Sequence, residues 1–83
     1  MLKVSVISPE KTLFEGEVDS IVAPAFDGEV GILTSHAPMM TLLGKGMLRL
    51  GSGGSAGRFD VDGGFLQVID NNVRIVTEKA TQA

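Results

Sequence analysis

Residues 58–69, with the sequence RFDVDGGFLQVI, decide the fold class. Phe59 and Val61 alternate with three charged residues, which is the period-two pattern of a strand with one buried face. The pair Gly63-Gly64 then interrupts the chain before a second apolar run. Two short runs separated by turn residues predict neighbouring strands rather than a helix.

Similar runs continue on both sides of this stretch, over residues 2–7, 13–15, 18–26, 29–33, 47–50 and 73–77. Asp27-Gly28 predicts a two-residue hairpin turn between two of them. Residues 38–43 are too short for a stable helix and are predicted as a strand, while residues 78–83 are compatible with the start of a helix. Short strands with glycine-rich turns are typical of an all-β sandwich or barrel.

Composition narrows the function classes. The chain has 83 residues, no cysteine, one histidine and a formal net charge of −3. This length predicts a single domain over residues 1–83, and the missing cysteines exclude disulfides and a thiolate metal site. The acidic balance argues against a nucleic-acid partner. The longest apolar run is far below the roughly 20 residues of a membrane span, and the N-terminus does not resemble a signal peptide. We expect no cofactor and no metal.

Three motifs with possible chemistry have simpler explanations. Residues 51–56 match a dinucleotide-binding glycine pattern, but a strand pattern rather than a helix follows them. Asp60-x-Asp62-Gly63 begins like a calcium loop and then lacks its later ligands. Ser35 and His36 are adjacent, and neighbours on an extended segment point to opposite sides, so they do not readily share a proton. We therefore expect no catalytic residue, although a small hydrolase that uses His36 stays an alternative.

Charge and apolar pairs predict a contact surface instead. Six acidic residues lie between Glu10 and Glu29, and none lies between Val30 and Phe59. Within that second stretch, Ile32-Leu33, Met39-Met40 and Leu42-Leu43 are adjacent apolar pairs. On a strand, each pair supplies one core residue and one apolar side chain on the outer face. A domain of this size is too small to bury both faces of a sheet well, so the outward residues are expected to contact a partner. The alternative is that local irregularity of the strands buries all of them.

Four blocks, in order, resemble the epsilon subunit of F-type ATP synthases. They are residues 6–10 (VISPE), 28–38 (GEVGILTSHAP), 46–50 (GMLRL) and 61–68 (VDGGFLQV). The resemblance extends from Leu2 to about Glu78. The chain departs from the family at Thr34-Ser35, where Pro followed by Asn or Gly is usual, and at Gln67, where an acid is usual. Family members commonly continue into a two-helix hairpin past the position of Ala83, so we expect a form without that hairpin's inhibition or ATP binding.

The resemblance implies a flattened β-sandwich of about ten strands and a central-stalk role without catalysis. It implies two protein partners, the gamma subunit and the membrane rotor-ring (c) subunits, and a peripheral location on the cytoplasmic face of the bacterial inner membrane, reached only through the complex. The rotor-ring contact falls on Asp27, Gly28 and Glu29. The gamma contact falls on Ser8, His36, Ala37, Pro38, Met40 and Thr41. A stand-alone β-sandwich module that binds a ligand or peptide is the alternative.

Overall fold

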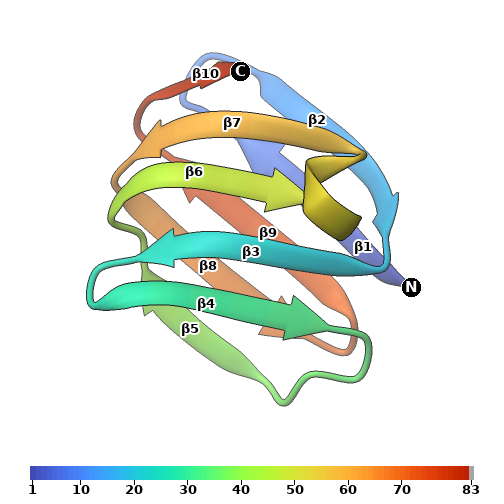
Figure 1. Cartoon of the computed structure of the whole chain (residues 1–83). Coiled ribbons are helices and arrows are strands. Elements are labelled where there is room, and N and C mark those ends of the chain that lie inside the picture. Colours follow the sequence, from blue (N-terminus) through green and yellow to red (C-terminus); the bar gives the residue numbers. More distant parts are fainter. Residues whose placement is uncertain (83) are drawn as a thin grey trace.

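The computed structural model describes residues 1–82, and these form two five-stranded sheets packed face to face (Figure 1). The first sheet has the order β2 (Thr12–Val18), β1 (Leu2–Ile7), β9 (Asn72–Thr77), β8 (Gly64–Ile69), β5 (Met39–Leu42). The second has the order β10 (Ala80–Gln82), β7 (Gly57–Asp62), β6 (Lys45–Leu50), β3 (Ser20–Ala25), β4 (Gly28–Leu33). A single 3-10 turn, η1 (Ser52–Gly54), lies between β6 and β7. The predicted all-β sandwich of ten short strands is confirmed.

The core lies between the sheets and follows the period-two pattern. Phe59 and Val61 of β7 are buried, whereas Asp60 and Asp62, which alternate with them, are exposed on the outer face. The three adjacent apolar pairs divide in the same way. Leu33, Met40 and Leu42 are exposed, while their neighbours Ile32 and Leu43 are buried and Met39 packs against the core. The expectation that each pair supplies one inward and one outward side chain is confirmed.

Neighbouring strands pair antiparallel with one exception, the parallel pair of β1 and β9. In that pair Lys3 lies opposite Asn72 and Ile7 lies opposite Val76. Since β8 runs antiparallel to both β9 and β5, the strands β1, β9 and β5 all run in the same direction. Their last residues therefore lie at one end of the first sheet.

One local prediction was wrong, and one segment that was compatible with the start of a helix is a strand. The turn between β3 and β4 consists of Phe26 and Asp27, not Asp27-Gly28, because Gly28 pairs with Ala25 and closes the hairpin with a φ of 135° that glycine tolerates. Residues 80–82 form strand β10 and not a helix. The buried Thr77 hydroxyl, which lies 2.9 Å from the carbonyl oxygen of Lys79, holds the corner that directs the chain onto β7. Within the described residues, no helix has the length and apolar character needed to cross a membrane.

Candidate functional site

An apolar band crosses the outer face of the first sheet at one end. The register places Ile7 of β1 opposite Val76 of β9, Val76 opposite Phe65 of β8, and Phe65 opposite Leu42 of β5. Residues directly opposite each other share a face, so these four side chains form a continuous row over four strands. The first three are partly exposed and Leu42 is 62% exposed. We call these four residues the apolar band.

The next row on the same face is polar, except at its edge. Ser5 lies opposite Arg74, Arg74 opposite Gln67, and Gln67 opposite Met40. Met40 is 65% exposed and stands on the edge strand β5 beside the apolar band. The apolar surface is therefore concentrated at one end of the face and along the β5 edge, while the exposed Ile69 lies at the opposite end of β8.

The residues predicted to contact gamma do not form one cluster. Met40 and Thr41 lie on β5, and residues 36–38 lie in the loop that leads into its start. Ser8 follows the end of β1, where its backbone N–H donates to the Lys11 carbonyl at 2.9 Å. Three strand spacings separate β1 from β5, about 14 Å, and the two loops lie at opposite ends of the sheet. A partner that contacts all of these residues must cross four strands, as the apolar band does, and must also reach from one end of the sheet to the other.

The loop before β5 is held by backbone contacts. The Ser35 N–H donates to the side-chain oxygen of Asn71 at 2.6 Å, and the His36 N–H donates to the Leu33 carbonyl at 3.1 Å. The His36 Nδ1 lies 2.7 Å from the carbonyl oxygen of Ala37. Among the described residues, the Ser35 hydroxyl forms no hydrogen bond with His36 and no group of three acidic, histidine or cysteine side chains could hold a metal. Ser35 and His36 are therefore not arranged as a nucleophile and its base.

The acidic hairpin belongs to the second sheet, and its acids have different surroundings. Asp27 lies in the two-residue turn itself and makes no ion pair within residues 1–82. Glu29 lies on the outer face of β4, where its Oε2 accepts from Nη2 of Arg49 at 2.7 Å. Arg49 stands on β6, so the ion pair reaches across β3. This ion pair connects the acid-rich residues 10–29 to the acid-free residues 30–59.

Sequence reasoning missed two residues at this site, Phe26 in the turn and Arg49 on β6. Phe26, the first residue of the turn, is 67% exposed, and its N–H donates to the Leu42 carbonyl at 3.0 Å. An aromatic residue directly before an Asp-Gly pair was the signal that could have identified it. Arg49 offers no such signal, because its contact with Glu29 depends on the strand order of the second sheet.

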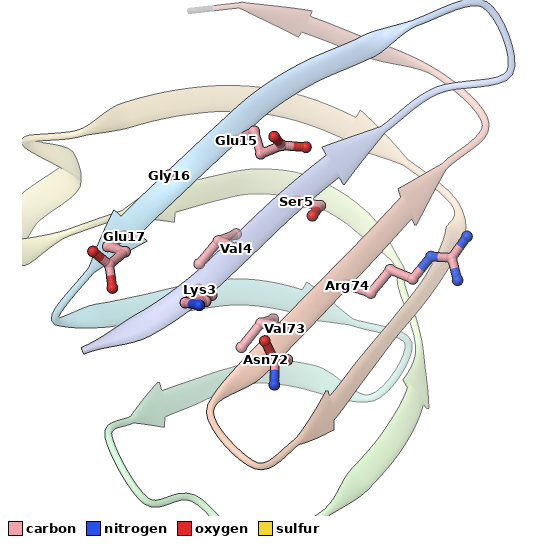
Figure 2. Close-up of a pocket in the computed structure, with 9 residues that line it drawn as sticks. All are labelled: Lys3, Val4, Ser5, Glu15, Gly16, Glu17, Asn72, Val73 and Arg74. Atoms are coloured by element: carbon pink, nitrogen blue, oxygen red, sulfur yellow. The ribbon is translucent and has the colours of Figure 1, made fainter.

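An open trough of about 550 Å³ covers the polar part of the first sheet's outer face. Figure 2 shows Glu15 and Glu17 along β2, Lys3 and Ser5 along β1, and Arg74 on β9. Val4, Gly16 and Val73 line its floor. The trough carries charges of both signs and does not include His36. It is a shallow polar surface that adjoins the apolar band.

The comparisons with known proteins agree with this architecture. The family model described as "ATP synthase, Delta/Epsilon chain, beta-sandwich domain" matches residues 1–83. The ATP synthase epsilon chain of Leptospira borgpetersenii is 51% identical over 77 residues, which cover 93% of this chain and 61% of that relative. The epsilon chain of Caulobacter vibrioides is 40% identical over 82 residues, covering 99% of this chain and 95% of that relative.

A chain in the cryo-EM structure of the Euglena gracilis mitochondrial ATP synthase OSCP/F1/c-ring assembly has the same fold. It superposes with a TM-score of 0.86 at 26% identity, covering 98% of this chain and 52% of that one. Against several of its bacterial relatives, this chain spans about three fifths of their length. The match over the whole sequence, and the ten-strand sandwich that accompanies it, show that the chain belongs to the ATP synthase delta/epsilon chain β-sandwich family.

Proposed function

We propose that this chain is a non-catalytic central-stalk subunit of a proton-translocating F-type ATP synthase. It links the gamma subunit to the membrane rotor ring, so that ring rotation is transmitted to the catalytic head. In this role it is peripheral to the membrane, on the cytoplasmic side in a bacterium, and reaches the membrane only through the complex. Family membership supports the assignment, and the names of the relatives in synthase assemblies agree with it.

The apolar band is the observation that supports the gamma contact best. A two-layer sandwich has no further layer to cover Ile7, Val76, Phe65 and Leu42, and single exposed apolar residues are common whereas a continuous row is not. Covering an exposed Leu or Phe side chain stabilises a complex by about 1.5 to 3 kcal/mol before ordering costs. A gamma surface laid across the first sheet covers the row and also meets both Ser8 and Met40.

The acidic hairpin supports the ring contact. Asp27 lies in the tight turn of the second sheet and Gly28 and Glu29 follow it on β4, away from the polar trough. The carboxylates of Asp27 and Glu29 suit basic side chains on the ring's polar loops. Exposed charge pairs contribute at most about 1 kcal/mol each, so they orient the subunit more than they hold it. The firm attachment in this proposal is to gamma.

Cysteine crosslinking in the assembled synthase tests both faces. The chain has no cysteine of its own, so each variant carries a single reactive site. We expect His36→Cys and Leu42→Cys to crosslink to cysteines in gamma, and Glu29→Cys to crosslink to a cysteine in the ring's polar loop. Asp60→Cys is the matched control, since it is exposed on the outer face of β7 and is expected to link to neither. Reversed partners, or crosslinks from Asp60→Cys alone, would refute the assignment.

A further inference from the structure

Phe26 has the exposure of a contact residue and lies beside the charge at the tip of the hairpin. It occupies the first position of the two-residue turn and is 67% exposed. Turn positions are usually filled by Gly, Pro, Asn, Asp or Ser, each for a conformational reason that does not apply to Phe. Nor is Phe26 among the partly buried apolar residues that pack against the core. A large aromatic side chain that the domain itself does not use is typical of an interface anchor.

The two acids of the hairpin are not equivalent. The Glu29 carboxylate is 2.7 Å from the Arg49 guanidinium, whereas Asp27 makes no ion pair within the described part of the chain. A cation on a partner meets Asp27 with no ion pair already formed, whereas the Glu29 carboxylate is already paired with Arg49 through Oε2. The turn therefore presents one apolar side chain and one available negative charge, adjacent in sequence.

Glu29 also has a role within the sheet. The register places Arg49 of β6 directly opposite Arg58 of β7, and like charges in that position destabilise a sheet. The Glu29 carboxylate brings a negative charge to this pair from the other side of β3. The ion pair between Glu29 and Arg49 offsets the repulsion between Arg49 and Arg58. The Glu29 carboxylate therefore has a reason to stay on Arg49 when a partner binds.

We infer that the ring-contact element of this chain is the Phe26–Asp27 pair, with Phe26 as its apolar anchor, and that Arg49 is a positioning residue that retains Glu29. The inference rests on the proposed function and specifies its ring contact. The partner surface it fits is a polar loop that presents a basic side chain next to an apolar one. Phe26 is assigned to the ring rather than to gamma because it shares its two-residue turn with Asp27.

The experiment measures binding of this chain, assembled with gamma, to the purified rotor ring in lipid nanodiscs. Four variants are compared with the wild type: Phe26→Ser, Asp27→Asn, Glu29→Gln and Leu33→Ser. Leu33→Ser is the matched apolar control, since Leu33 is 64% exposed at the far end of β4 from the turn. All four positions are exposed, and the circular-dichroism melting curve of each variant establishes that it folds.

Phe26→Ser is expected to weaken binding about tenfold, as loss of one buried aromatic anchor implies. Asp27→Asn is expected to weaken it about threefold and to flatten its salt dependence, since one charge contact is lost. Leu33→Ser is expected to change it less than about twofold. Glu29→Gln is expected to weaken it less than Asp27→Asn does, since Arg49 already pairs with the Glu29 carboxylate.

Three outcomes overturn the inference. A loss for Glu29→Gln as large as that for Phe26→Ser would mean that the paired acid makes the contact. An equal loss for Leu33→Ser would remove the special role of the turn. Photocrosslinking from position 26 to gamma in place of the ring would assign Phe26 to the other partner. If the wild-type assembly does not bind the ring, the proposed ring contact itself fails. If the wild type binds and one of the three outcomes above is found, only this inference fails.

Discussion

Gly64 lies so close to the backbone of Val76 that a Cβ on Gly64 would overlap the Val76 carbonyl oxygen. The φ of Gly64 is 113°, in a region that other residues rarely adopt. The second glycine of the Gly63-Gly64 pair thus allows β8 to start directly against the end of β9, beside the apolar band that Phe65 and Val76 share.

Gly64→Ala is therefore expected to destabilise the domain by at least about 2 kcal/mol, because both the steric overlap and the positive φ must be relieved. The measurement is urea unfolding followed by circular dichroism. Gly31→Ala is the control, since a Cβ there meets no atom within 4 Å and Gly31 has no positive φ. A Gly64→Ala domain as stable as the Gly31→Ala domain would contradict the close approach.

Thr77→Val is expected to cost about 1 to 3 kcal/mol, although valine has nearly the same shape, because the buried hydroxyl serves the Lys79 backbone. The hydroxyl also lies 3.1 Å from the Gly63 carbonyl. Hydrogen exchange of residues 79–82 should accelerate more than exchange in β7, since β10 loses its corner. Thr81→Val, at an exposed position on β10, should leave both measurements nearly unchanged.

The neighbours Leu42 and Leu43 are expected to respond oppositely to substitution by alanine. Leu43 is 5% exposed, so Leu43→Ala should destabilise the fold by about 2 to 4 kcal/mol. Leu42 is 62% exposed, so Leu42→Ala should change stability by less than about 0.5 kcal/mol. In the proposed complex, Leu42→Ala should instead weaken gamma binding about fivefold. Isothermal titration of gamma with each variant measures the loss of binding. Equal losses for Leu42→Ala and Leu43→Ala would contradict the assignment of Leu42 to binding and of Leu43 to the core.

A double-mutant cycle over Glu29 and Arg49 should give a coupling of about 0.5 kcal/mol at low salt, since both side chains are substantially exposed. The cycle uses Glu29→Gln, Arg49→Gln and the double variant, each measured by urea unfolding. At about 1 M salt the coupling should approach zero because the charges are screened. Asp27→Asn paired with Arg49→Gln is the control cycle and should show no coupling at either salt concentration. Coupling that survives high salt would indicate a contact other than this ion pair.

Local patterns were sufficient for the sandwich and for much of the core. Alternation predicted that Phe59 and Val61 face inward, and adjacency predicted that one member of Leu42-Leu43 does, because strand geometry is a property of consecutive residues. The apolar band could not be predicted in this way, since it depends on pairing Ile7 with Val76 from distant parts of the sequence. The one-residue shift of the β3–β4 turn had a similar cause.

The exposure of Phe26 was missed because of this one-residue shift of the β3–β4 turn. Reading Asp27-Gly28 as the loop assigned Phe26 to the strand, although the structure places it in the turn. The family resemblance pointed to the hairpin as a contact, but resemblance does not say which of its side chains are already engaged within the domain. Only the position of Arg49 beside Glu29 distinguishes the two acids.

The parallel pairing of β1 with β9 also determines when the domain can form during synthesis. Lys3 pairs with Asn72, which is 72 − 3 = 69 positions later in the chain. A ribosome adding about 5 to 20 residues per second needs about 3 to 14 seconds to cover that distance. For those seconds the inward residues of β1, Leu2, Val4 and Val6, have β2 as their only neighbour within the first sheet. The nascent chain is then most exposed to aggregation, and a chaperone that binds its first residues would protect it until β9 emerges.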